Sequence, residues 1–326
     1  MSRDVSEIFT VELDNHENLR ADRYIGDYLK LFTRSQIKHR AVRVLLHNKE
    51  IKLSKLLTSG DIITVEYNNP ELLELVPENM NLNIIYEDKN AIVINKPQGM
   101  VVHPGAGNYT GTLVHGLLYH CNEMTNRFSE DDIRPGIVHR LDKDTSGVII
   151  SAKNPDTLEY LASQFRNKST QKFYIAMVKG VPVKNEGIIE TNIARDLNNR
   201  KKFTVSKTRG KSALSRYKVI ESYGDLSLVL LGLETGRTHQ LRVHMLDLGN
   251  SILGDPVYGR KSGLFPEITL MLHALQLSIN LPSSVENGKV EISTFRAPVP
   301  KRFVDIIDKI SRDPKKTLML VEKALD

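Results

Sequence analysis

Apolar residues in the central and C-terminal parts of the chain follow two different spacings. Short runs rich in β-branched residues predict buried strands at 84–86, 91–94, 136–138 and 148–150, and an alternating pattern predicts another at 172–180. Apolar positions three and four residues apart predict helices over 112–119, 155–166, 238–249 and 301–310. In the third of these helices, Thr238 is expected to cap the first turn and Gly249 to end the helix.

The first 80 residues are patterned as a smaller unit with its own elements. Helical spacing predicts a short helix over 23–32 and a second helix that carries Ile37 and Ala41. Strands are expected at 44–46 and 62–65, and turns at 47–49 and 59–61. Prolines and glutamates between residues 68 and 80 indicate an acidic linker. At the other end of the chain, the lysine-rich segment beyond Asp313 indicates a mobile tail.

Length and composition limit the class of protein. A chain of 326 residues, 40% of them hydrophobic, can bury a full core and is expected to form two domains. The single cysteine, Cys121, excludes an internal disulfide, fits a reducing compartment and is expected to be a small half-buried residue. The first residues lack an apolar secretory core and no apolar run reaches membrane-spanning length, so a soluble cytoplasmic protein is expected.

The net charge is 45 − 39 = +6, and the basic residues are concentrated in two segments. Ten basic and three acidic residues lie between Arg20 and Lys55, and eight basic residues and one acidic residue lie between Arg195 and Arg216. Both clusters are candidates for contacts with a nucleic-acid backbone, and the second is expected on a projecting β-ribbon. The alternative in each case is an ordinary solvated face. The candidate contacts are Arg34, Lys38, Arg40, Arg43, Arg200, Lys201 and Lys202.

The stretch from His139 to Gly147 connects two predicted strands and is dense in charge and turn residues. It carries two carboxylates, Asp142 and Asp144, with Arg140 and Lys143 beside them. Cationic neighbours favour the ionised form of a carboxylate, so a nucleophilic aspartate is one interpretation of this loop. Ordinary turn chemistry, in which the carboxylates bind their own backbone, is the other interpretation.

Histidine positions argue against a metal site. The available histidines are His103, His115, His120 and His139, with Asp142 near the last. No pair has helical i, i+4 spacing with a third ligand nearby, and there is no cysteine pair. We therefore expect no metal.

The central loop, His139-Arg-Leu-Asp-Lys-Asp-Thr-Ser-Gly147, resembles the signature of the RluA/RluD-type RNA pseudouridine synthases. Similar blocks stand in order at 95–104, 172–180 and 235–244. The resemblance implies an α+β catalytic domain with a mixed, largely antiparallel sheet and a central cleft. It also implies that Asp142 is the nucleophile, that Tyr174 stacks on the target uracil, and that Arg237 pairs with the aspartate. A part in the later proton transfer is a further role that the resemblance leaves open for Tyr174. Arg242 and His244 are expected to be structural, and Arg140 to fill the gap that a flipped base leaves.

The implied reaction is the isomerisation of uridine to pseudouridine within RNA, without cofactor or metal. The step that the aspartate performs remains open. The three candidates are attack on C1′, attack on C6 and assistance of glycal formation. The RluD-like blocks favour large-subunit ribosomal RNA, or its precursor particle, over transfer RNA as substrate, and a monomer is expected. A non-catalytic RNA-binding or ribosome-assembly protein on the same scaffold is the alternative. A glycosidase is disfavoured, because Asp142 and Asp144 are too close in sequence to face each other across a sugar.

Residues 19–67 resemble the S4 RNA-binding domain, although His47-Asn48-Lys49 replaces the usual Asn-Gly-Lys at the hairpin. Asn tolerates the left-handed conformation that such a turn needs. The expected organisation is an N-terminal arm (1–18), the S4-like domain (19–67), the linker (68–80), the catalytic domain (81–310) and a C-terminal tail (311–326).

Overall fold

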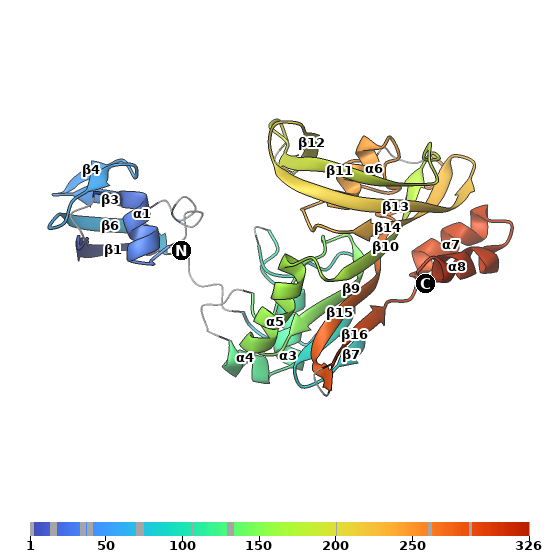
Figure 1. Cartoon of the computed structure of the whole chain (residues 1–326), viewed down its shortest axis with the longest axis horizontal. Helices are drawn as coiled ribbons and strands as arrows, with labels where there is room; N and C mark the ends of the chain where they lie inside the picture. Colours follow the sequence, from blue (N-terminus) through green and yellow to red (C-terminus); the bar gives the residue numbers. More distant parts are fainter. Residues whose placement is uncertain are drawn as a thin grey trace. The chain divides into compact units, whose positions relative to one another are not determined.

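The computed structural model describes residues 3–13, 18–32, 37, 42–69, 75–105, 107–128, 134–199, 201–259, 263–286 and 289–325. The chain forms two compact units, which divide between Glu74 and Leu75 (Figure 1). The smaller unit holds the N-terminal strands and the larger unit holds the central loop and the remaining predicted elements.

The smaller unit is built on a four-stranded antiparallel sheet. Its strand order is β1 (Arg3–Thr10), β6 (Ile62–Asn69), β3 (Arg43–Leu46) and β4 (Lys49–Ile51). The short strands β2 (Leu19–Arg20) and β5 (Leu56–Leu57) pair separately, and α1 (Ala21–Arg23) continues into the π-helical turn η2 (Tyr24–Tyr28). The core of this unit includes Tyr24, Ile25, Val44, Ile63 and Val65.

Several expectations for the N-terminal part are wrong. The predicted arm is strand β1, which pairs with β6 along its whole length because half-buried Val5, Glu7 and Phe9 alternate with exposed residues. The predicted helix over 23–32 is replaced by α1 and η2, which end at Tyr28 ahead of a left-handed residue at Lys30. The second predicted helix lies outside the described residues except for buried Ile37.

The hairpin turn is confirmed, whereas the linker is shorter than predicted. His47 and Asn48 both have positive φ angles, 48° and 63°, as a two-residue hairpin between paired strands requires. Strand β6 runs to Asn69, so it takes the first two residues of the predicted linker. Leu75 packs against the core of the larger unit, and Glu78 accepts a hydrogen bond from the Gly111 amide.

The larger unit contains a ten-stranded mixed sheet, as predicted. Its strands pair antiparallel except β9 with β15. The order is β12-β11-β13-β14-β10-β15-β9-β8-β7, and β16 also pairs with β15. The bounds are β7 (Ile84–Glu87), β8 (Ala91–Lys96), β9 (Ser146–Ala152), β10 (Gln171–Lys179), β11 (Glu186–Arg195), β12 (Phe203–Ser206), β13 (Lys211–Tyr223), β14 (Leu226–Leu233), β15 (Leu272–Glu286) and β16 (Lys289–Arg296).

Helices cover this sheet at three places (Figure 1). Helix α5 (Pro155–Arg166) packs on β9 and β15, and helix α6 (Gln240–Asp247) packs on β11, β12 and β13. Helix α8 (Pro314–Lys323) packs on β13 and on helix α7 (Lys301–Ile310). Helix α3 (Leu113–His120) is followed by the short helix α4 (Glu123–Arg127). The predicted helices at 112–119, 155–166 and 301–310 are therefore confirmed.

Three expectations in this unit are wrong. Residues 136–138 form no strand, because Gly136 takes a left-handed conformation and only Ile137 bridges to Ser151. Thr238 is not a helix cap, because the chain is left-handed at His239 and α6 starts one residue later. The predicted tail contains α8, which begins at an Asp313 cap and buries Val321.

The close parallel contact between β9 and β15 fixes the strand that follows the central loop. A Cβ atom at Gly147 would lie 2.0 Å from the carbonyl oxygen of Ala274, and the φ angle of Gly147 is +114°. A residue with a side chain would therefore clash with the neighbouring backbone and would also be strained. This contact determines where the loop before Gly147 leaves the sheet.

Candidate active site

A cavity of about 80 Å³ opens where the central loop faces the start of α6. The loop supplies one wall, strand β10 supplies Tyr174, and the turn before α6 supplies the opposite wall. The lining residues are Arg140, Leu141, Asp142, Thr145, Tyr174, Leu233, Gly236, Arg237, Thr238, His239, Gln240, Leu241, Arg242 and Leu272. Asp142, Tyr174 and Arg237, which were predicted from three separate blocks, thus line one cavity.

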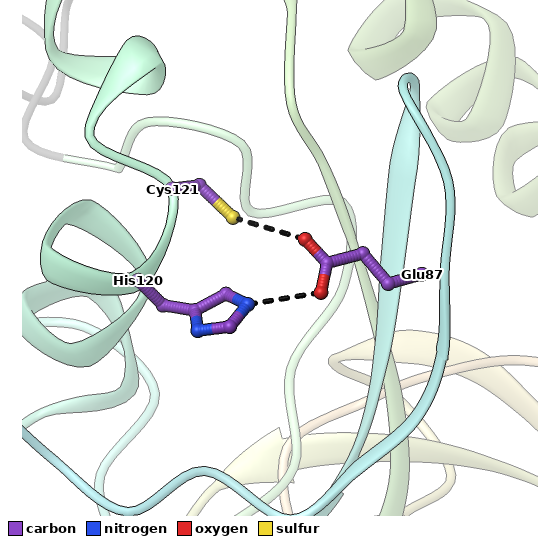
Figure 2. A group of neighbouring side chains, drawn as sticks. All are labelled: Glu87, His120 and Cys121. Carbon is purple, nitrogen blue, oxygen red and sulfur yellow. Dashed lines mark hydrogen bonds and ion pairs between the residues drawn. The ribbon is translucent and has the colours of Figure 1, made fainter.

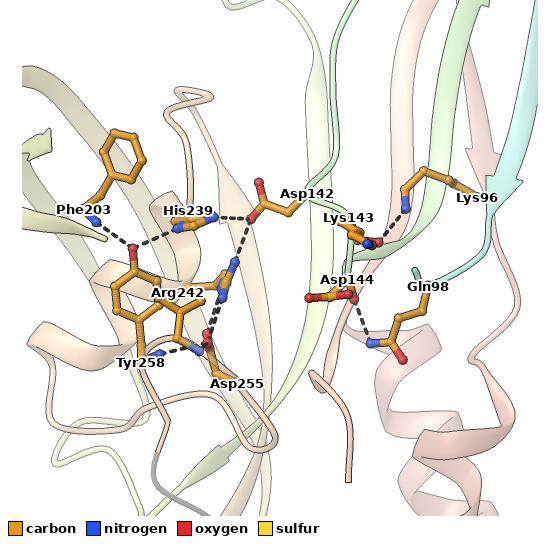
Figure 3. Close-up of polar contacts among 11 residues, drawn as sticks. Lys96, Gln98, Asp142, Lys143, Asp144, Phe203, His239, Arg242, Asp255 and Tyr258 are labelled. Atoms are coloured by element: carbon orange, nitrogen blue, oxygen red, sulfur yellow. Dashed lines mark hydrogen bonds and ion pairs between the residues drawn. The ribbon is translucent and has the colours of Figure 1, made fainter. Parts of the chain in front are cut away.

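Asp142 faces two nitrogen-bearing side chains across this cavity (Figure 3). The Arg242 guanidinium donates from Nη1 to Asp142 Oδ2 at 3.3 Å, and His239 Nε2 lies 3.9 Å from the same oxygen. The contact with Arg242 holds the carboxylate in place at the cavity wall, and a carboxylate is a group that can act as a nucleophile.

The loop that carries Asp142 is held by the buried side chain of Lys96, on the side away from Arg242 (Figure 3). The Lys96 ammonium is fully buried and donates to the carbonyl oxygens of Pro97, Met100 and Lys143. Burial lowers the pKa of Lys96 to about 7, and the charges of Asp142 and Asp144 act in the opposite direction. The sequence-based predictions gave Lys96 no role, although it lies in the Asn-Lys-Pro block.

Two further side chains connect the loop to the sheet. The Gln98 amide donates to the carbonyl oxygens of Asp144 and Leu270, at 2.7 and 2.9 Å. His139 Nε2 accepts from the Ile150 amide at 3.1 Å, and its ring stacks on Phe165. Burial lowers the pKa of His139 to about 3, so this ring stays neutral and keeps that acceptor.

Arg242 is itself fixed by a buried partner. Its Nε and Nη2 atoms donate to the two carboxylate oxygens of Asp255, both at 2.7 Å, and the two side chains are 4% and 1% exposed. Asp255 also accepts from the amides of Val257 and Tyr258. Although burial acts against both charges, this pairing raises the pKa of Arg242 and lowers that of Asp255. A two-pronged pair of this kind sets the plane of the guanidinium.

Arg237 does not pair with the aspartate, and this prediction is wrong. The Arg237 amide donates to Gln240 Oε1 and its Nε atom donates to the carbonyl oxygen of Ser212 on β13. Within the described residues, the guanidinium that contacts Asp142 is Arg242, which was expected to be structural. The left-handed residue at His239 turns the chain between the two arginines, so Arg242 points inward from the first turn of α6.

Tyr174 lies on β10, where it pairs with Leu231 of β14 and Ala274 of β15. Its side chain is 7% exposed and lines the cavity. Burial, and then the charge of Asp142, raise the pKa of Tyr174, so its hydroxyl stays protonated at neutral pH. An aromatic face at the wall of a cavity is a suitable surface for an unstacked base.

The predicted RNA contacts are only partly described. Arg140 is exposed and lines the cavity, and Lys201 and Lys202 lie in the turn between β11 and β12. Arg43 is exposed but forms ion pairs with Glu50 and Glu66. Arg34, Lys38, Arg40 and Arg200 lie outside the described residues. The basic segment does form a ribbon of β11, β12 and β13, as expected.

One group of potential metal ligands was not expected from the positions of the histidines in the sequence. Glu87, His120 and Cys121 place one ligand atom each within 4.8 Å of one another (Figure 2). Lys153 forms an ion pair with Glu87 Oε1, and burial raises the pKa of the Cys121 thiol to about 11. The His120 imidazole and the Cys121 thiol both form hydrogen bonds with the Glu87 carboxylate, so this group connects the end of α3 to β7.

Comparisons with known proteins place the chain in a family. The family described as RNA pseudouridylate synthase matches residues 90–247, which include Asp142 and Arg242. Ribosomal large subunit pseudouridine synthase D of Borreliella burgdorferi is 47% identical over 308 residues, covering 93% of each chain. The protein of that name in Neisseria meningitidis serogroup B is 39% identical and covers 87% of this chain and 75% of its own.

A solved structure of a related protein also matches this chain. Human RNA pseudouridylate synthase domain containing 1 superposes with a TM-score of 0.52 at 28% identity, covering 71% of this chain and 86% of its own. The chain therefore belongs to the RNA pseudouridine synthase family, whose enzymes isomerise uridine in RNA. Among the described residues, no helix has the length and apolar character to cross a membrane.

Asp255→Asn tests whether the pair with Arg242 stabilises the site. Asn keeps the shape and the backbone hydrogen bonds but removes the charge, so a buried guanidinium loses its main partner. We expect the free energy of unfolding in urea to fall by about 3 kcal/mol. The control is Glu159→Gln, which removes an exposed partner of Arg166 and should change stability little. Equal effects of the two substitutions would contradict a special role for the buried pair.

Proposed function

We propose that this enzyme converts uridines of large-subunit ribosomal RNA to pseudouridine, with Asp142 as the nucleophile. The observation that carries the proposal is the convergence of Asp142, Arg242 and Tyr174 on one cavity. The large-subunit substrate follows from the names of the relatives in Borreliella burgdorferi and Neisseria meningitidis. We further propose that the enzyme works in the cytoplasm as a monomer.

The chemistry suits these side chains. The target base must leave the stack, at a cost on the order of a few kcal/mol, and stacking on Tyr174 offsets part of that cost. Asp142, held in place by Arg242, promotes cleavage of the bond between C1′ and N1. The freed uracil turns within the cavity and rejoins C1′ through C5. Both bonds involve C1′ of one nucleotide, so no cofactor is needed.

Two basic surfaces are proposed to hold the RNA outside the cavity. The ribbon of β11, β12 and β13 carries Lys201 and Lys202 at its turn, and Arg140 stands at the cavity wall. The smaller unit is proposed to be an S4-like RNA-binding domain, on the basis of its basic composition and its confirmed hairpin turn. Contacts with phosphates would supply affinity that does not depend on sequence.

Asp142→Asn should abolish pseudouridine formation, because an amide of the same shape is no nucleophile. RNA affinity should stay within about twofold, since the substitution leaves the shape of the loop unchanged. Pseudouridine would be counted by mass spectrometry in a large-subunit RNA fragment after incubation with the enzyme. The matched control is Asp144→Asn, two residues away in the same loop, which should stay active. Normal activity of Asp142→Asn would refute the assigned nucleophile.

Removal of residues 1–74 tests the smaller unit as an RNA contact. If this unit neutralises phosphates, its loss should weaken RNA binding and flatten the plot of log affinity against log salt concentration. Binding would be measured at four salt concentrations for the full chain and the shortened chain. A control with Lys201 and Lys202 both changed to Ser should reduce the slope by about two if the ribbon contacts two phosphates. An unchanged slope after the deletion would exclude the smaller unit from the interface.

A further inference from the structure

Arg302 of helix α7 reaches the starts of two strands next to the active-site cavity. Its Nη2 atom donates to Ser146 Oγ at 2.6 Å and to the carbonyl oxygen of Leu272 at 3.1 Å. Ser146 is the first residue of β9, and Leu272 is the first residue of β15. One nitrogen atom of a C-terminal helix therefore ties together the points at which these two strands begin.

The segment next to this contact carries the proposed nucleophile. Ser146 directly follows Thr145, which lines the cavity, and the Thr145 amide donates to the carbonyl oxygen of Asp142 at 3.1 Å. Leu272 lines the same cavity from β15. A shift of either strand start would therefore move a wall of the cavity or the turn that holds Asp142.

The backbone alone gives the two strand starts little support. Strands β9 and β15 pair in parallel over two positions, which involve Ser146 and Gly147 on β9. So short a parallel pairing supplies few hydrogen bonds. The side chains add to it, because Ser146 Oγ lies 2.8 Å from Nδ1 of His273, its partner on β15, and both residues are buried. The Ser146 hydroxyl is thus held by β15 and by α7.

Arg302 occupies this place without a carboxylate partner among the described residues. Its Nε atom is buried and forms no hydrogen bond, and its Cζ atom lies 5.3 Å from the centre of the Phe303 ring. Burial lowers the pKa of Arg302 to about 10, so the guanidinium keeps its charge at neutral pH. A buried charge without an ionic partner destabilises a fold. Global stability therefore does not explain why an arginine stands here.

We propose that Arg302 is a positioning residue for the active-site loop, because it holds the starts of β9 and β15 at the spacing that places Asp142 opposite Arg242. This inference rests on the proposed function. Arg302 lies outside the cavity lining, so it acts through Ser146 and Leu272 and not on the RNA. Helix α7 thus contributes to the site through a single side chain.

The test is Arg302→Met in the full-length enzyme, because Met keeps an unbranched stem and removes both the donors and the charge. In a single turnover with saturating enzyme on a large-subunit RNA fragment, pseudouridine formation should slow by about tenfold or more, since small misplacements of reacting groups are costly. RNA affinity should stay within about twofold. The midpoint of urea unfolding should change little, because the variant also removes an unpaired buried charge.

Two further variants report on the same contact. Arg302→Lys keeps a donor and a charge, so its rate should lie between those of Arg302→Met and the wild-type enzyme. Ser146→Ala removes the hydroxyl that links Arg302 to His273, and it should also slow the reaction. Because the two side chains form one contact, the effects of Ser146→Ala and Arg302→Met should not add in the double variant. Ser146→Ala replaces Arg302→Met in the measurements above if the latter fails to fold.

Val321→Ala is the matched control. Val321 is buried on α8, which packs on α7 and β13, so its truncation loosens the C-terminal helices and leaves the contacts of Arg302 in place. This variant should lower the unfolding midpoint and keep the wild-type rate within about twofold.

Three results would overturn the inference. They are a normal rate in Arg302→Met, a loss of RNA affinity as large as its loss of rate, and an equal loss of rate in Val321→Ala. A wild-type enzyme that forms no pseudouridine would instead refute the proposed function.

Discussion

Arg242 shares one guanidinium between two carboxylates, and the site depends on this arrangement. Two of its nitrogens bind Asp255 in a geometry that fixes the plane of the group, and a third reaches Asp142. A buried arginine is costly unless its donors are satisfied, and Asp255 meets that need away from the cavity. The remaining donor is therefore held where it meets the Asp142 carboxylate. Because Asp142 accepts only one longer hydrogen bond from this guanidinium, its second oxygen stays available for chemistry.

The other half of the site depends on the loop that carries Asp142. Lys96 and Gln98 donate hydrogen bonds to the carbonyl groups of Lys143 and Asp144 in that loop. The close contact of Gly147 with Ala274 fixes the strand that follows. Loops positioned by a rigid sheet are common places for reactive groups. Arg242 and Asp142 belong to segments 100 residues apart, so the sheet between them sets the distance across which they meet.

Local sequence patterns predicted the parts of this structure that depend on local physics. Helix α5 follows an Asn154 cap and a proline, and β8 and β9 follow β-branched runs, so each could be located from its own residues. Strand β1 was missed because its side chains do not alternate by polarity: Glu7 is half-buried, whereas Ile8 is 72% exposed. The predicted mobile tail was wrong because the apolar face of α8 packs against a distant strand, β13.

At the site, too, the features set by local sequence were predicted and those set by distant contacts were not. The contiguous loop from His139 to Gly147 pointed to Asp142, which lines the cavity. Tyr174 was placed correctly on a strand, but that strand is buried along most of its length rather than half-buried. The choice between Arg237 and Arg242 depended on a left-handed turn at His239, which no glycine marks in the sequence. Asp255 acquires its role only through its contact with α6.

The most direct measurement of the central claim compares Arg242→Lys with Arg237→Lys in single-turnover pseudouridine formation on a large-subunit RNA fragment. Lysine keeps the charge but cannot bridge two carboxylates with a planar fork. The arrangement seen here predicts that Arg242→Lys slows the reaction by about 10²-fold, while Arg237→Lys stays within about tenfold of the wild-type rate. The opposite order would contradict the assignment of Arg242 as the residue that holds Asp142.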